Sequence, residues 1–263
     1  MTDLRVTHIG GPTTLIEVDG WRLLTDPTFD DPGRKYHFGW GTASRKVTGP
    51  AIAAADLGPI DAVLVTHDHH ADNLDEAGRA LLPSAGVVVT TVAGASRLGG
   101  GARGLAPWAT TRLESPGRPS IDVTATPCRH GPPLSRPVVG DVIGFALRWD
   151  GQRHGVLWIS GDTVLYDGVR QVADRLEVGV ALLHLGEARF PVTGPVRYTM
   201  TAQDAVDLCR LVRPRTTIPV HYEGWTHFRQ GGAAIEREFA SATSDIRRGF
   251  RLVPLGVAVE IPA

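Results

Sequence analysis

The sequence contains little cysteine, little lysine and no long apolar run. Cys128 and Cys209 are too few for a disulfide framework or for a zinc site built from thiolates. Lysine occurs only at positions 35 and 46, so arginine carries nearly all of the positive charge. No segment approaches the about 18 uninterrupted apolar residues of a membrane-spanning helix, and the amino terminus lacks a basic segment followed by an apolar one. These absences predict a cytoplasmic protein with no membrane span and no secretory signal.

Net charge is also nearly absent. The 263 residues include 27 Lys and Arg against 28 Asp and Glu, which gives a formal charge of -1. This balance argues against a nucleic-acid partner held by many phosphate contacts. With 42% hydrophobic and 21% charged residues the chain can bury a large core, and its length suits one layered α/β domain over residues 1–263. The state of oligomerisation stays open, with a homo-oligomer among the alternatives.

Short apolar runs alternate with helical patterns along the chain. Residues 13–18 and 21–25, joined by Asp19-Gly20, predict a β-hairpin, and Asp150-Gly151 marks a second one. Thr201 with Asp204 predicts the start of a helix. The order predicts an α/β fold of two mixed sheets flanked by helices. Further strands are expected at 62–65, 87–91, 121–126, 178–185, 216–220 and 250–261, helices at 74–82, 205–212 and 233–239, and a long functional loop at 26–59.

Potential metal ligands follow several of the expected strands. The run 62–65 ends at His67 and His69, and three later strand-like runs lead to His130, Asp162 and His221. Side chains at strand ends can converge in one crevice, although they lie far apart in the sequence. In an extended chain residues i and i+2 share a side, so His67 and His69 are expected to bind one ion together.

The chemistry of these residue types indicates which ion they would bind. Imidazole and carboxylate ligands without a nearby thiolate suit Zn²⁺, with Mn²⁺ or Fe²⁺ as alternatives. The other histidines carry weaker signals. His184 lies inside an apolar strand-like run and is interpreted as a core histidine, whereas His227 lies in a loop and is a candidate substrate contact or proton donor.

Four segments in order resemble the metallo-β-lactamase-fold hydrolases, in the subgroup similar to L-ascorbate-6-phosphate lactonase and N-acyl-phosphatidylethanolamine phospholipase D. They are GGPTTLIEVDGWRLLTDP, PIDAVLVTHDHHADNLD, Gly-Asp-Thr at 161–163 and Ile-Pro-Val-His-Tyr at 218–222. The resemblance implies an αββα sandwich with a metal site between the sheet edges. It also implies one ion on His67, His69 and His130, a bridging Asp162, and His221 on a second ion.

The first motif departs from the family pattern H-x-H-x-D-H. The chain has His-Asp-His-His-Ala-Asp-Asn from His67 to Asn73. Either Ala71 stands where the Asp is expected, or one extra residue moves Asp72 and Asn73 one place on. Asp72 is then the carboxylate left for the second ion, and an imidazole is missing unless His70 substitutes for it. The alternative role of Asp72 and Asn73 is to cap the following helix.

The expected reaction is hydrolysis of a small ester, lactone or phosphoester by a metal-bound hydroxide. Asp162 would position the hydroxide, and His227 is a candidate donor of the leaving group's proton. Three arginines close to the expected site, Arg129, Arg189 and Arg197, hint at an anionic small-molecule substrate, because guanidinium matches carboxylate or phosphate. The altered motif keeps an alternative open, in which a fold relative has lost catalysis and binds a ligand or partner through the same cleft.

Overall fold

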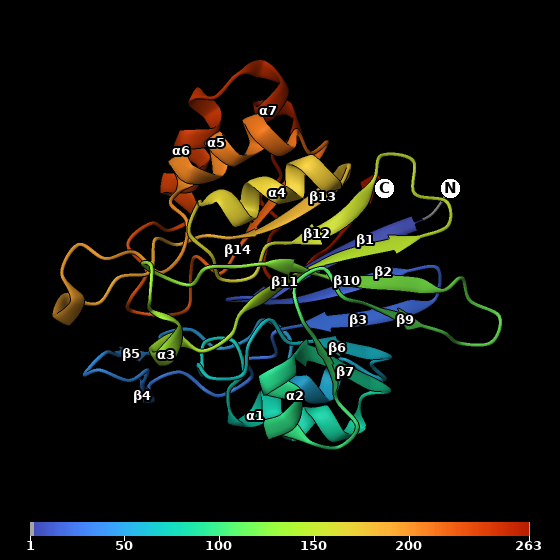
Figure 1. The fold of residues 1–263 in the computed structure, drawn as a ribbon, viewed down its shortest axis with the longest axis horizontal. Helices are drawn as coiled ribbons and strands as arrows, with labels where there is room; N and C mark the ends of the chain where they lie inside the picture. Colours follow the sequence, from blue (N-terminus) through green and yellow to red (C-terminus); the bar gives the residue numbers. More distant parts are fainter. Residues whose placement is uncertain (1–2, 263) are drawn as a thin grey trace.

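The computed structural model describes residues 3–262. Two large β-sheets pack face to face, and helices cover both outer faces (Figure 1). The predicted α/β arrangement of two mixed sheets flanked by helices is therefore confirmed. Within residues 3–262 there is no helix of the length and apolarity needed to cross a membrane.

The first sheet comes mainly from the amino-terminal half of the chain. Its order is β15-β1-β2-β3-β6-β7-β8, antiparallel from β15 to β3 and parallel from β3 to β8. The turn between β2 and β3 has positive φ at Asp19 and Gly20, as the Asp-Gly pattern predicts. The strands are β1 (Asp3–Gly10), β2 (Thr13–Val18), β3 (Trp21–Thr25), β6 (Ala62–Leu64), β7 (Val87–Thr91), β8 (Arg103–Leu105) and β15 (Ala258–Pro262).

The second sheet has six strands in the order β14-β13-β12-β11-β10-β9. Strands β12, β13 and β14 run parallel to one another, and the remaining pairs are antiparallel. A separate pair, β4 and β5, forms a small hairpin inside the long loop expected at 26–59. The strands are β4 (Lys35–His37), β5 (Ala43–Arg45), β9 (Thr110–Leu113), β10 (Ile121–Pro127), β11 (Ile143–Trp149), β12 (Val156–Ile159), β13 (Val178–His184) and β14 (Thr216–Val220).

Helices α1 and α2 cover the first sheet, and α4 to α7 cover the second (Figure 1). Helix α5 begins with the predicted capping box, in which Thr201 and Asp204 each accept a hydrogen bond from the other's backbone N–H, both at 3.0 Å. The helices are α1 (Glu76–Leu81), α2 (Val92–Leu98), α3 (Arg136–Val139), α4 (Asp167–Arg175), α5 (Ala202–Val212), α6 (Gly232–Ser241) and α7 (Ser244–Gly249), with 3₁₀ turns at Ala54–Asp56, Leu82–Ser84 and Pro191–Thr193.

Several parts of the chain differ from the sequence-based expectation, which does not include helices α3, α4 and α7 or strands β1, β8 and β9. Helix α2 follows β7 without a break, so its short pattern merges with that of the strand and is not predicted. Residues 250–257 have strand-like composition but lie outside the sheets, apart from one bridge between Phe250 and Thr217. Pro254 has no N–H to donate and Gly256 takes a φ of 73°, so the chain turns before β15 joins the sheet.

The two sheets are held together by a core of buried apolar side chains, to which Ile16 and Leu23 contribute from one sheet and Phe145 and Leu157 from the other. This packing fixes the edges of both sheets relative to one another. The segments that follow β6, β10, β12, β13 and β14 then meet at one end of the sandwich, where α3 and the β4–β5 hairpin also lie, on the left of Figure 1. The fold thus brings together the strand ends on which the sequence places metal ligands.

Candidate metal centre

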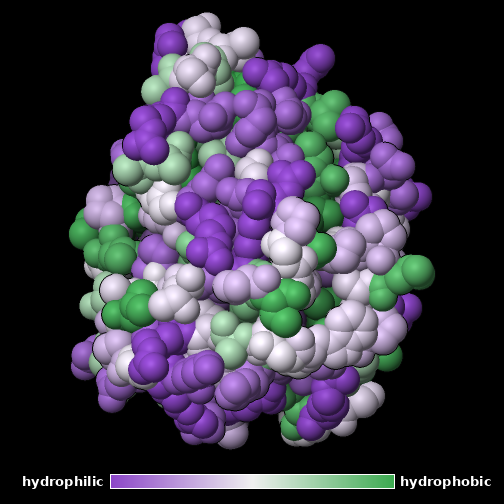
Figure 2. Space-filling model, turned by 90° about the vertical axis from the view of Figure 1, so that its left-hand side faces the viewer, coloured by the Kyte–Doolittle hydropathy of each residue, from purple (hydrophilic) through white to green (hydrophobic). Residues whose placement is uncertain are grey.

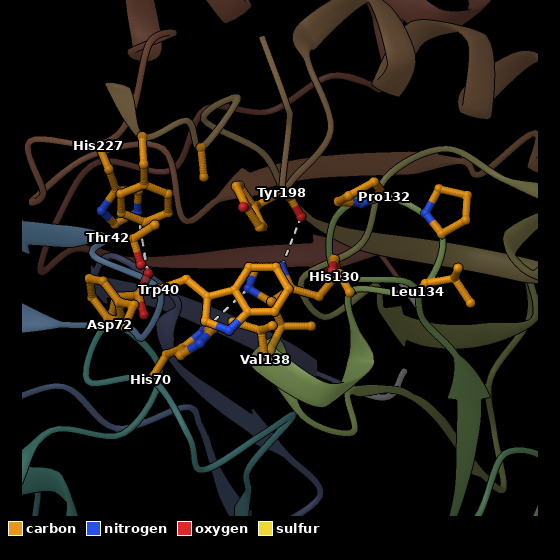
Figure 3. A pocket seen from close by; sticks show the side chains of 16 residues that line it. Trp40, Thr42, His70, Asp72, His130, Pro132, Leu134, Val138, Tyr198 and His227 are labelled. Atoms are coloured by element: carbon orange, nitrogen blue, oxygen red, sulfur yellow. Dashed lines mark hydrogen bonds and ion pairs between the residues drawn. The ribbon is translucent and has the colours of Figure 1, made fainter. Parts of the chain in front are cut away.

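Three buried histidines converge at this end of the sandwich. The Nδ1 atom of His70 lies 3.3 Å from Nε2 of His67 and 3.2 Å from Nε2 of His130. A tetrahedral Zn²⁺ with Zn–N bonds of 2.0–2.1 Å has its nitrogen ligands about 3.3–3.4 Å apart. The spacing of this first cluster, His67, His70 and His130, therefore fits a metal ion bound by three imidazoles. Figure 3 shows two of them, His70 and His130.

Neighbouring groups set the direction of two of these rings. His130 Nδ1 lies 2.8 Å from the backbone oxygen of Tyr198, an acceptor that requires the proton on Nδ1 and leaves Nε2 as a lone pair. His67 Nδ1 lies 3.2 Å from Thr66 Oγ1, which in turn donates to the buried carboxylate of Asp26 at 2.9 Å. Because Thr66 Oγ1 uses its own hydrogen for Asp26, it accepts from the Nδ1–H of His67, and the lone pair of this ring is on Nε2. Both rings thus direct a lone pair toward His70.

Burial keeps two histidines of the first cluster, His67 and His70, uncharged. Removal from water, reinforced by the neighbouring histidines, holds the pKa of His67 well below its ordinary value. Burial and His130 likewise lower the pKa of His70 to about 4. Both imidazoles are therefore neutral near pH 7, which is the protonation state that binds a metal ion.

The structure brings His70, and not His69, to the first cluster. The sequence places His69 beside His67 because residues i and i+2 share a side of a strand, but β6 ends at Leu64 and the chain bends from position 66 onwards. The His69 ring instead lies 3.2 Å from Arg97 and against Gly140, with 30% of its side chain exposed. The bend makes residue i+3 the partner of His67.

Arg97 is what holds this bend. Its guanidinium group binds both carboxylate oxygens of Asp68, at 2.8 and 2.5 Å, and so fixes the residue between His67 and His69 to helix α2. Gly140, with a φ of 73°, has no Cβ that would collide with the His69 ring at 2.2 Å. The spacing between His67 and Asp72 is thus one residue longer than in the family pattern. This agrees with the alignment in which an extra residue moves Asp72 and Asn73 one place on.

A second cluster, Asp162, His184 and His221, lies in the same region. Asp162 Oδ1 accepts hydrogen bonds from Nδ1 of His184 at 2.9 Å and from Nδ1 of His221 at 2.7 Å. Burial opposes protonation of His221, but the charge of Asp162 and contacts with Asp162 and Asp72 outweigh it and raise the pKa of His221 to about 10. Without a metal ion a protonated His221 balances the charge of Asp162, and a cation bound at His221 would have to replace that proton.

Asp72 lies between two histidines from the carboxyl-terminal part of the chain. Its Oδ2 is 3.6 Å from Nε2 of His221 and 3.2 Å from Nε2 of His227. Asn73 occupies the position at which the shifted family motif has a histidine, and its side chain is fully buried. The cap of helix α1 is Asp75, so neither Asp72 nor Asn73 has the alternative role of a helix cap.

Buried polar atoms without a hydrogen-bond partner are concentrated here. Each such atom costs about 1–3 kcal/mol when left unsatisfied, so a group of them indicates a missing ligand. The charge of Asp162 opposes the fall in the pKa of His67, and His130 helps to lower the pKa of Asp162, so the two clusters lie within electrostatic range of each other. The unpartnered atoms of the site include Oδ1 of Asp72, Oδ2 of Asp162, Oδ1 of Asn73 and Nε2 of His70, His184 and His221.

The sequence patterns favour a core role for His184 and do not identify it as a residue of the site. It ends β13 just as Asp162 follows β12 and His221 follows β14, so the strand-end signal that found the others also applied to it. Its position inside an apolar run favours a core residue, and the ring is indeed fully buried. Only the pairing of β13 between β12 and β14 shows that the ring meets Asp162.

A cavity of about 250 Å³ opens over the clusters (Figure 3). It includes four residues of the site, His70, Asp72, His130 and His227, which we call its floor. Its volume is below the about 300–1,000 Å³ of cavities that take drug-sized ligands, so it suits a small molecule.

The sandwich and its paired clusters of histidine and aspartate at one end define a metal-dependent hydrolase of the metallo-β-lactamase fold. Residues 21–222 match the family model described as a beta-lactamase superfamily domain, and the chain belongs to that family.

Relatives that align with this chain over most of their own length are described as metal-dependent hydrolases. A UPF0173 metal-dependent hydrolase of Deinococcus radiodurans is 31% identical over 83% of this chain and 84% of its own length. Another, from Pelotomaculum thermopropionicum, is 26% identical over 75% of this chain and 83% of the relative. The fold matches that of an isothiocyanate hydrolase from Delia radicum gut bacteria with a TM-score of 0.81, at 18% identity, over 98% of this chain and all of that one.

Proposed function

We propose that this metal-dependent hydrolase cleaves a small ester, lactone or phosphoester and binds its first ion, Zn²⁺, through His67, His70 and His130. The observation that carries the ligand assignment is the spacing of the three imidazole nitrogens, 3.2 and 3.3 Å about His70 Nδ1. Three imidazole ligands would leave the fourth position of a tetrahedral ion open to a reacting molecule, and two of them, His70 and His130, line the cavity.

Asp72, Asp162 and His221 are the residues we assign to a second ion. Asp162 has one carboxylate oxygen engaged by histidines and one without a partner, and the free oxygen would be available to a metal ion. When bound, the ions activate a water molecule and polarise the oxygen of the scissile group. His184 holds the engaged oxygen of Asp162 and so fixes the direction in which the other one points.

We assign transfer of the leaving group's proton to His227. Its ring lines the cavity, and Asp72 Oδ2 lies 3.2 Å from its Nε2. Phe190 stacks on the same ring at a centroid distance of 5.2 Å and restricts its rotation. The imidazole is thus held beside the reacting group by one polar and one apolar contact.

Metal removal tests the proposed function. Protein purified without chelator is expected to contain about one to two ions per chain, and to hydrolyse lactone, aryl ester or phosphodiester reporters. Dialysis against a chelator should abolish turnover, and Zn²⁺ should restore it. Protein that contains no metal and turns over no reporter would instead support a fold relative that only binds a ligand or partner.

Asp72→Ala is expected to reduce the metal content by about one ion per chain while the first cluster keeps its own ion. The physical reason is that Asp72 is the carboxylate next to His221 but makes no contact with the ring nitrogens of the first cluster. Elemental analysis of the purified variant measures this directly. Asp207→Ala, which removes an exposed carboxylate on α5, serves as the matched control and should keep the wild-type content. An unchanged metal content in Asp72→Ala would contradict the assignment of Asp72 to a second ion.

A further inference from the structure

The cavity over the metal centre has an aromatic wall. The Phe38 ring lies 5.2 Å from that of His70 and 5.9 Å from that of His227, so it stands directly beside two residues of the floor. Phe190 packs beside it at 5.8 Å. These rings present flat apolar faces to whatever molecule reaches the metal ligands.

The opposite wall is also apolar. It comes from the loop after His130 and from α3, and it consists of Pro132, Pro133, Leu134, Val138 and Val139. Figure 3 shows Leu134 on the right, Asp72 and His227 on the left, and Trp40 close to Val138 between them. Trp40 and Leu134 are 75% and 93% exposed, so their surfaces are not covered by the rest of the chain. Exposed apolar side chains that line a concave site are typical of ligand contacts.

Among residues 3–262, no arginine or lysine lines this cavity. Arg129, whose position in the sequence suggests an anionic substrate, lies over the Tyr166 ring at 4.7 Å and lines two neighbouring depressions, one of which also includes His130. Arg189 is paired with Glu187, and Arg197 donates to Asp204 at 3.1 Å. Arg189 and Arg197 are thus paired with carboxylates outside the cavity, and Arg129 lies over an aromatic ring.

Two of the hydroxyl groups that line the cavity, those of Thr42 and Ser135, are also engaged. Thr42 donates to the backbone oxygen of Gly39 at 2.6 Å, and Ser135 donates to that of His130 at 2.7 Å. A charged group on the distant end of a substrate would therefore lose its hydration without gaining a partner. Figure 2, which views this end of the molecule, shows green hydrophobic residues among the hydrophilic ones.

We propose that the substrate is a small uncharged acyl compound, an ester or lactone, whose alkyl or aryl group lies between the aromatic wall and α3. The inference rests on the proposed function and narrows its substrate class. The reaction adds water across the acyl C–O bond: the OH group joins the acyl carbon, the bond to the leaving oxygen breaks, and that oxygen takes the remaining proton. Each methylene buried between the walls is expected to improve binding by about 4-fold.

Binding of two hydroxamic acids to the metal-loaded protein tests the inference. Butyrohydroxamic acid and succinic monohydroxamic acid share the head group that binds a metal ion and differ at the distant end, which is a methyl group in one and a carboxylate in the other. Isothermal titration is expected to give at least about 10-fold tighter binding of the uncharged compound. Equal affinities, a preference for the charged compound, or binding of neither would overturn the inference.

Two variants test whether this cavity causes the preference for the uncharged hydroxamic acid. Val138→Arg puts a cation into the α3 wall and is expected to lower the ratio of the two affinities by about 5-fold. Val192→Arg puts the same cation on a 61% exposed side chain outside the cavity lining, and the ratio should stay unchanged. An unchanged ratio in Val138→Arg, or an equal change in both variants, would contradict the placement.

Binding and turnover separate this inference from the proposed function. If the uncharged hydroxamic acid binds preferentially but no ester, lactone or phosphoester is cleaved, the substrate class of the cavity stands and the proposed reaction fails. If phosphodiesters or anionic esters are cleaved and the charged hydroxamic acid binds better, the reaction stands and the inference fails.

Discussion

His70→Ala is expected to release the ion of the first cluster, whereas His69→Ala is expected to keep it. His70 Nδ1 is the atom that both His67 Nε2 and His130 Nε2 approach, within 3.2–3.3 Å. Removal of a residue that hydrogen-bonds a metal ligand weakens metal binding by about 10–100-fold. Removal of the ligand itself should weaken it more. Activity should fall with the metal content, because the metal supplies the nucleophile.

His69→Ala is the matched control, since it removes an imidazole from the same turn of chain. Its ring contacts Arg97 and is partly exposed, so its loss should leave both metal content and turnover near the wild-type level. Elemental analysis and a competition titration with a chromophoric chelator measure the two variants side by side. Metal loss in His69→Ala with retention in His70→Ala would restore the i, i+2 pairing that the sequence alone predicts.

Lys46→Ala is expected to lower the free energy of unfolding by about 3–5 kcal/mol. Lys46 is one of two lysines in the chain, and its ammonium group is almost completely buried 2.9 Å from Asp75 Oδ2. Its removal leaves a buried carboxylate without its counter-charge. Denaturation followed by circular dichroism measures the change, and Lys35→Ala at an exposed position should alter stability by less than about 0.5 kcal/mol.

The same ion pair also connects stability with the site. Asp75 caps α1 by accepting from Gly78, and it accepts from the backbone N–H groups of Phe29 and Asp30 as well. It thereby anchors the start of the long loop that carries Phe38 to the cavity. A loss below about 1 kcal/mol in Lys46→Ala would show that Asp75 finds another partner when the ammonium group is absent.

The sequence by itself determined the features that depend on local chemistry. The Asp-Gly turn at 19–20 is set by positive φ angles, and the start of α5 is set by reciprocal hydrogen bonds between residues three apart. The strand ends also followed from patterns, because a buried strand must be apolar and its polar successor stands out. For this reason the positions of His67, His130, Asp162 and His221 could be predicted without coordinates.

Only the tertiary structure decided which histidine joins His67. The direction of a side chain beyond a strand end depends on the dihedral angles of the bend, and these are fixed by the distant contact of Asp68 with Arg97 on α2. His184 was likewise decided by the neighbours of β13 in the sheet. The cavity walls come from three separate segments, and the apolar lining beside the metal ligands arises only when the sandwich brings those segments together.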